Sequence, residues 1–335
     1  MPPVPAPPAL LVGAAAAAGA RPARVAARWL PAPPKPASQG GNHDALAGQV
    51  RATLAAIEAL RAANPQRLGE ARHAPNRWAA NIGANTGKDF DPVYPFFEAG
   101  YAGLAVEIAQ SMQAALHANL PWERVKKSRE AVTPSNIVGL LAGAGAPASL
   151  DLFKIDIDSH DVFVMRELLR NGTFRPKVIV MEINESVPPP LCFSVNFARA
   201  FGWSGHDAFM GCSVSMVDHQ LTPLGYVMVD VEWNNVVLVA EEYAEAFPRH
   251  SPADLWRVGY WERAGRAQAF PWNEAPGRLA YTAEPDPFEA LRILSDSMLA
   301  SDTYRLSRST FALYVHPDYV DTRAHTLKTT HCAEC

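Results

Sequence analysis

From about Trp78 to Ala240 the chain alternates short apolar segments with helical patterns, and this alternation restricts the possible folds most strongly. Apolar runs occupy 78–82, 104–106, 150–157 and 177–183, with a weaker run within 125–132. Runs this apolar, separated by helices, are typical of a parallel sheet covered on both faces. Two further runs, 226–231 and 236–240, flank Asn234 and Asn235, a hairpin turn signal. We therefore predict an α/β fold with a Rossmann-like, doubly wound, mostly parallel sheet and an antiparallel closing hairpin.

Segments of different character flank this predicted domain, which we place at residues 74–245. Residues 44–63 carry apolar side chains at three- and four-residue steps, so 44–73 is predicted to be a helical prefix. Residues 246–335 are predicted to form a C-terminal extension with a disordered tail. Residues 1–43 are rich in Ala, Pro and Arg and contain no acidic residue, as expected of a disordered leader or a targeting segment. A targeting role would send the protein to an organelle or the secretory pathway; otherwise we expect it in the cytoplasm.

Composition and charge exclude several classes of protein. With 48% hydrophobic residues the chain can bury a core, and four cysteines exclude a scaffold built on disulfides. The net charge of −4 gives no basic field to attract nucleic acid. The longest apolar run, 9–20, is too short for a transmembrane segment. These features leave small molecules or glycans as the expected partners and do not define an oligomeric state.

The first predicted strand ends in a glycine-rich turn, Gly83-x-Asn85-x-Gly87. Glycines at the carboxyl end of such a strand let backbone amides approach a ligand closely. Glu107 ends the second predicted strand, where an acid hydrogen-bonds the ribose hydroxyls of a nucleotide cofactor. Glu107 has an alternative interpretation as a cap of the helix that follows.

Polar side chains also end the fourth and fifth predicted strands. Alternation along an extended segment would point Asp156, Asp158 and His160 to one side, and Glu182 and Asn184 likewise. Oxygens gathered at this sheet edge are ligands that Mg²⁺ prefers. His160 could instead be a general base for a substrate hydroxyl.

Each of these polar residues also has a structural interpretation. Asp161 would cap the helix that follows it, and His160 would be an ordinary loop histidine. Glu182 and Asn184 would only hold backbone amides in the next turn. The aromatic segment 188–209 lies where a lid over an acceptor would be, or it belongs to the core.

Several segments, in order and spacing, resemble the FkbM-like family of class I S-adenosylmethionine-dependent methyltransferases. The resemblance covers roughly residues 76–245 and rests on the segments 81–87, 103–107, 154–158 with Asp161, 178–184, 211–213 and 224–226. It implies O-methyltransferase activity, with the methionine moiety at the 83–87 turn and the ribose at Glu107. Two positions depart from the family pattern: Asn81 stands where Asp is usual, and Ser159-His160 stand where Gly is common.

The sequence thus predicts an S-adenosylmethionine-dependent methyltransferase that acts on a hydroxyl of a small molecule or sugar. The predicted cofactor-binding residues are Asn81, Gly83, Asn85, Gly87, Glu107, Val132 and Asp156. The predicted catalytic residues are Asp156, Asp158 and His160, and a possible Mg²⁺ site comprises Asp156, Asp158, Glu182 and Asn184. Two alternatives stay open. One is a metal-dependent glycosyltransferase that uses the Asp156-x-Asp158 pair, and the other is a catalytically inactive binding protein of the methyltransferase fold.

Overall fold

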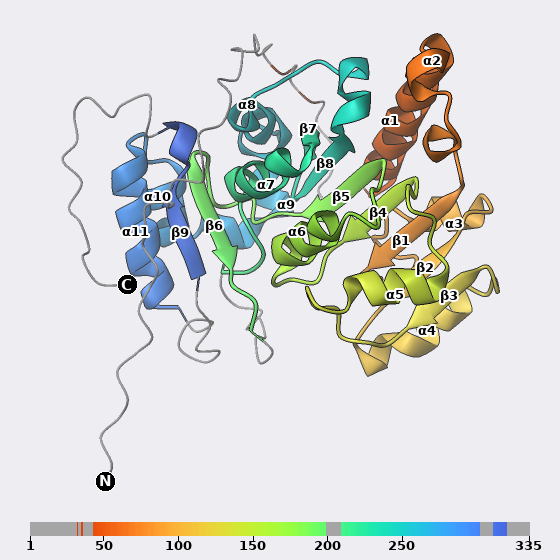
Figure 1. The fold of residues 1–335 in the computed structure, drawn as a ribbon. Coiled ribbons are helices and arrows are strands. Elements are labelled where there is room, and N and C mark those ends of the chain that lie inside the picture. The colour runs from red at the N-terminus through yellow and green to blue at the C-terminus, as the bar shows by residue number, and fades with distance from the viewer. Residues whose placement is uncertain (1–31, 33–34, 36–42, 199–208, 302–310, 320–335) are drawn as a thin grey trace.

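A seven-stranded sheet, in the order β3-β2-β1-β4-β5-β8-β7, forms the centre of the molecule (Figure 1). The computed structural model describes residues 32, 35, 43–198, 209–301 and 311–319. The five strands from β3 to β5 in this order run parallel, and β8 pairs antiparallel with both β5 and β7. The strands are β1 (Trp78–Ile82), β2 (Ala102–Val106), β3 (Val125–Ser128), β4 (Leu152–Ile155), β5 (Val178–Glu182), β7 (Tyr226–Glu232) and β8 (Asn235–Ala240). The predicted fold class is confirmed.

Helices cover the sheet because its central strands are apolar on both faces. Every residue of β1, β4, β5 and β8 is buried, as expected of strands packed between two layers of helices. The helices are α1 (His43–Ala63), α2 (Pro65–Leu68), α3 (Tyr94–Glu98), α4 (Gln113–Asn119), α5 (Ile137–Ala144), α6 (Asp161–Asn171), α7 (Val214–Leu221), α8 (Pro252–Trp256), α9 (Arg266–Ala269), α10 (Pro276–Thr282) and α11 (Pro287–Leu299). None of those in the described part of the chain combines the length and apolarity that a membrane crossing requires.

A second sheet, which the sequence patterns do not predict, joins the segment after β5 to the C-terminal extension. Its strands β6 (Leu191–Val195) and β9 (Phe311–Val315) pair antiparallel. Together with α10 and α11 they enclose a separate small core that includes Phe193, Tyr281 and Leu294. This unit lies at the end of the molecule away from β3 (Figure 1). Residues on both sides of position 245 therefore share one core.

Three residues of the segment predicted as a leader are described: His43 begins α1, and Ala32 and Lys35 contact the folded domain. Ala32 is buried, and Lys35 Nζ lies 2.7 Å from Asp230 Oδ2 and 2.8 Å from Glu232 Oε2 on β7. Glu232 Oε1 also pairs with Arg263 Nη1 at 2.6 Å. The rest of residues 1–43 lies outside the described part of the chain, so its role as a leader stays a prediction.

We expect Lys35→Ala to lower the free energy of unfolding by about 1–2 kcal/mol, between the values for exposed and buried ion pairs. The physical reason is that Asp230 is buried and pairs with Lys35, whereas Glu232 keeps Arg263. Arg292→Ala is the control, because its partners Glu289 and Asp296 lie on the exposed face of α11. Urea unfolding monitored by circular dichroism measures both. Equal midpoints for the two variants would show that Lys35 does not anchor the segment.

Candidate active site

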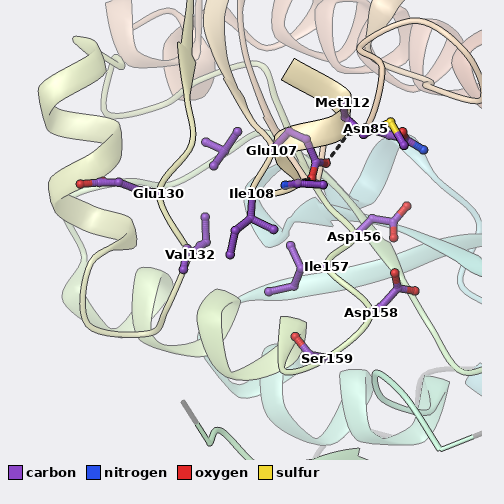
Figure 2. A pocket seen from close by; sticks show the side chains of 14 residues that line it. Asn85, Glu107, Ile108, Met112, Glu130, Val132, Asp156, Ile157, Asp158 and Ser159 are labelled. Carbon is purple, nitrogen blue, oxygen red and sulfur yellow. Dashed lines mark hydrogen bonds between the residues drawn. The ribbon is translucent and has the colours of Figure 1, made fainter. Parts of the chain in front are cut away.

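A cavity of about 470 Å³ opens where the strand order reverses, at the carboxyl ends of β1, β2 and β4. The strand β1 has β2 on one side and β4 on the other, and ligands of doubly wound sheets bind at such a switch point. Figure 2 shows the cavity with Glu107 at one side and Asp156 and Asp158 at another. The predicted cofactor-binding residues that line it are Gly83, Asn85, Glu107, Val132 and Asp156.

The turn after β1 needs glycine at position 83 for two reasons. Gly83 has a φ of +76°, and a Cβ placed on it would lie 1.7 Å from the Asp156 carbonyl oxygen. Only glycine lets these two backbone segments approach so closely in the left-handed region. Gly87 serves packing instead, since a Cβ there would meet the Leu116 and Leu120 side chains, and Gly87 does not line the cavity.

Glu107 connects the turn after β1 with the segment after β2, and both of these segments line the cavity. Its Oε2 accepts a hydrogen bond from the Asn85 amide at 2.8 Å, and its Oε1 accepts one from the Ala109 amide at 2.7 Å. The first of these is the dashed line in Figure 2. The side chain therefore does cap the segment after β2, and it also lines the cavity. Because each carboxylate oxygen has a second lone pair, Glu107 retains capacity for ligand hydroxyls.

Asn81 does not line the cavity and instead holds a buried acid that the sequence patterns did not indicate. The Asn81 side chain is fully buried, and its Nδ2 donates a hydrogen bond to Asp91 Oδ2. Asn81 Oδ1 has no hydrogen-bond partner among the described residues. Asp91 Oδ1 accepts from the Val93 amide at 2.7 Å, and burial raises the pKa of Asp91. The FkbM-like pattern usually has Asp at position 81. In this protein the side chain at that position is an amide, but an acid, Asp91, lies beside it.

Lys154 is a second residue that supports the cavity wall and that the sequence patterns did not indicate. This buried residue of β4 donates from Nζ to the Gly83 carbonyl at 2.7 Å, and Nζ lies 3.3 Å from Asp156 Oδ2. Burial lowers the pKa of Lys154, but the Asp156 and Asp91 carboxylates raise it, and the net change is an increase. Lys154 therefore stays charged and holds the glycine turn against the end of β4. The available signal was a charged side chain within the apolar run of β4.

Three of the predicted polar residues come together at the carboxyl ends of β4 and β5. Asp156, Asp158 and Glu182 each offer an oxygen, and these oxygens all lie within 4.8 Å of one another. Glu182 Oε1 accepts from Asn234 Nδ2 at 3.0 Å, while Oε2 is buried without a hydrogen-bond partner among the described residues. Burial and the Asp156 charge raise the pKa of Asp158 to about 6, and the same causes raise the pKa of Glu182.

His160 does not join this cluster, contrary to the expected alternation. The strand ends at Ile155 and Asp158 adopts a left-handed φ of +54°, so the extended geometry that alternation requires is lost. His160 occupies the N-cap position of α6, with Nε2 3.2 Å from the Val132 carbonyl oxygen and its ring edge-on to Phe197. Burial lowers the pKa of His160.

Asn184 forms hydrogen bonds within its own loop and to Met210. Its Oδ1 accepts hydrogen bonds from the Ser186 amide and hydroxyl, and its Nδ2 donates to the Met210 carbonyl at 3.0 Å. This is the structural role that the sequence left open for it. The predicted metal-binding set is therefore reduced to the carboxylates of Asp156, Asp158 and Glu182. Of the aromatic segment 188–209, positions 199–208 lie outside the described residues.

Asp161 shapes the loop that carries Asp158. Its Oδ1 accepts from the Ile157 amide at 2.9 Å and its Oδ2 from the Ser159 amide at 3.1 Å. Burial raises the pKa of Asp161 to about 7, although both hydrogen bonds oppose the shift. Asp161, the first residue of α6, is thus a structural support for the loop that precedes the helix.

We expect the free energy of unfolding to decrease as pH rises, partly because of Asp161. Its folded-state pKa of about 7 lies above the ordinary value of 3.8, so the folded state binds the proton more tightly than the unfolded state. That contribution to stability is fully present below pH 3.8 and is lost as pH rises through about 7. Asp161→Asn should flatten the profile, because the amide does not titrate. Urea unfolding between pH 4 and 8 measures this, and identical slopes for both proteins would contradict the assignment.

Comparison with known proteins gives structural neighbours only. No protein-family model matches the chain, and no curated protein matches it. Similar solved structures include an S-adenosylmethionine-dependent methyltransferase from Clostridium acetobutylicum, with 11% identity, 49% of this chain and 83% of that chain covered, and a TM-score of 0.30. A Micromonospora echinaspora amino pentose methyltransferase of calicheamicin biosynthesis, solved with S-adenosylmethionine bound, shows 14% identity, 61% and 92% coverage, and a TM-score of 0.33.

A third similar structure is the Burkholderia thailandensis 1,6-didemethyltoxoflavin-N1-methyltransferase with bound 1,6-didemethyltoxoflavin and S-adenosylhomocysteine. It shares 17% identity, the match covers 62% of this chain and 92% of that chain, and the TM-score is 0.32. The neighbours are thus methyltransferases, but TM-scores below 0.5 at such identities establish no common activity. The fold class of this chain rests on its own strand order.

Proposed function

We propose that this protein is an S-adenosylmethionine-dependent methyltransferase of the FkbM-like kind that methylates a hydroxyl of a small molecule or glycan. The observation that carries the proposal is the position of Glu107. Glu107 directly follows β2, and its carboxylate lines the switch-point cavity and is fixed by the Asn85 and Ala109 amides. An acid in that position recognises the ribose hydroxyls of a nucleotide cofactor.

The other walls of the cavity fit the remaining parts of the same cofactor. A cavity of about 470 Å³ has the size of a small-molecule site. Ile108, Val132 and Ile157 supply aliphatic surface for an adenine ring, and Ile108 is 60% exposed directly beside Glu107. Gly83 lacks the Cβ that would push the turn away from Asp156. S-adenosylmethionine, when bound, supplies an electrophilic methyl group on a sulfonium.

The protein's own contribution is alignment of the acceptor and removal of its hydroxyl proton. We assign the second task to the neighbouring carboxylates of Asp156 and Asp158, which line the cavity (Figure 2). The pKa of Asp158, about 6, makes it ionised at neutral pH and more basic than an ordinary aspartate. His160 is buried outside the cavity lining, so a direct base role for it has less support.

Calorimetric titration tests the proposal against its alternatives. We expect S-adenosylmethionine and S-adenosylhomocysteine each to bind one site, and nucleotide sugars with Mn²⁺ not to bind. Nucleotide-sugar binding without S-adenosylmethionine binding would favour the glycosyltransferase alternative. Binding of neither ligand would support a protein of this fold that has lost its cofactor site.

The segments that flank the 74–245 domain are proposed to have targeting and supporting roles. Within the predicted leader, residues 1–43, we propose that the part before Ala32 directs the protein to an organelle or the secretory pathway. The 44–73 prefix and the 246–335 extension would then support the 74–245 domain, in line with the core shared between β6 and β9. Cell fractionation of the full chain and of a variant that begins at Ala32 tests the targeting role.

A further inference from the structure

The carboxylates of Asp156, Asp158 and Glu182 are poorly matched by positive charge. Lys154 Nζ lies 3.3 Å from Asp156 Oδ2 and also donates to the Gly83 carbonyl. In the described part of the chain, neither Asp158 nor Glu182 forms an ion pair with a basic side chain. Some other buried carboxylates of this protein do: Asp151 pairs with Lys177 at 2.7 Å and Glu232 with Arg263 at 2.6 Å. When its three carboxyl groups are ionised, the cluster therefore carries negative charge that nearby basic side chains do not balance.

Glu182 supplies a second, independent sign that something binds here. Its side chain is only 7% exposed, and its Oε1 is already satisfied by Asn234. The other oxygen, Oε2, has no hydrogen-bond partner among the described residues. A buried carboxylate oxygen without a donor is costly, so its retention indicates a partner that the polypeptide itself does not provide.

The spacing of the oxygens fits one metal ion. Two ligands on opposite sides of an ion lie about twice the metal–oxygen distance apart, which is about 4.0–5.2 Å for bonds of 2.0–2.6 Å. The oxygens of the cluster lie within 4.8 Å of one another. All the donors are carboxylate oxygens, the ligands preferred by Mg²⁺, Mn²⁺ and Ca²⁺ rather than by softer metals.

We propose that Asp156, Asp158 and Glu182 bind one divalent cation of the Mg²⁺ class at the rim of the cavity. Asp156 and Asp158 belong to the cavity lining, so the ion would lie beside the bound methyl donor. A cation there would lower the pKa of a coordinated acceptor hydroxyl. This catalytic role rests on the proposed function, whereas binding of the ion does not.

The test measures Mn²⁺ binding to the full-length, chelator-treated protein without any cofactor, through the EPR signal of free Mn²⁺. We expect one saturable site, from which Mg²⁺ displaces Mn²⁺. Asp158→Asn and Glu182→Gln should each weaken Mn²⁺ affinity about tenfold or more. Both substitutions preserve the local structure, since Asn tolerates the left-handed φ of position 158 and Gln can still accept from Asn234. Glu123→Gln, which removes an equal charge from the exposed surface, should leave affinity unchanged.

Two results would overturn the cation site. One is the absence of saturable Mn²⁺ binding at millimolar concentrations, and the other is binding that survives both cluster variants. A parallel titration with S-adenosylmethionine separates this inference from the proposed function. Cofactor binding without cation binding would contradict only the proposed cation site. Cation binding without cofactor binding would contradict only the methyltransferase assignment.

Discussion

Gly83→Ala is expected to weaken S-adenosylmethionine binding by about 100-fold or more and to lower the melting temperature. The new methyl group would lie 1.7 Å from the Asp156 carbonyl oxygen, a backbone atom that cannot rotate away. Overpacking of this kind costs about 1–3 kcal/mol, and a left-handed φ at a non-glycine residue adds about 1–2 kcal/mol. Relief of the overlap requires the turn and the end of β4 to separate, and these two segments form one wall of the cavity. Calorimetric titration and thermal unfolding measure both effects.

Gly139→Ala provides a control with the same chemical change. Gly139 lies inside α5, where a Cβ would have no neighbour within 4 Å. Alanine should stabilise this helix position by about 0.5–1 kcal/mol and leave cofactor affinity unchanged. Wild-type affinity in a folded Gly83→Ala variant would mean that the cofactor does not depend on this turn.

Glu107→Gln is expected to weaken S-adenosylmethionine binding by about 1.5–3 kcal/mol, or about 10- to 150-fold. The substitution keeps the shape of the side chain but removes the charge that strengthens hydrogen bonds from ribose hydroxyls. It also places an amide group where an oxygen now accepts from a backbone amide, so part of the loss will reflect a displaced turn.

A cofactor fragment separates these two contributions. Methionine lacks the ribose, so its binding should change less than that of S-adenosylmethionine if Glu107 contacts the ribose. Equal losses for both ligands would point to a displaced turn alone. Unchanged affinity for S-adenosylmethionine in a folded variant would remove Glu107 from the site.

The sequence patterns predicted the main sheet because its signals are local. β1 has the predicted bounds, because its continuous apolar run ends at a clear turn signal, Gly83. The strand pair of β6 and β9 was missed because its partners are far apart in the sequence. The first of them, residues 191–195, lies in a Pro- and Phe-containing segment without a strand-like alternation.

Within the candidate site, the sequence predicts which residues lie at the ends of the strands. It does not predict how side chains beyond the strand ends are oriented. Asp156, Asp158 and Glu182 do meet, because the carboxyl ends of neighbouring parallel strands share one sheet edge. His160 turns away because the left-handed Asp158 interrupts the alternation, and a single sequence does not specify that φ. Lys154 and Asp91 were missed because their roles depend on contacts with Gly83 and Asn81 that arise only when the sheet forms.

A crystal structure of the protein with S-adenosylhomocysteine tests the central assignment most directly. We predict the ribose hydroxyls within hydrogen-bond distance of the Glu107 carboxylate, the adenine beside Ile108 and Val132, and the sulfur toward Asp156 and Asp158. A cofactor located away from the carboxyl ends of β1, β2 and β4, or a cavity that stays empty at saturating cofactor, would contradict the proposal.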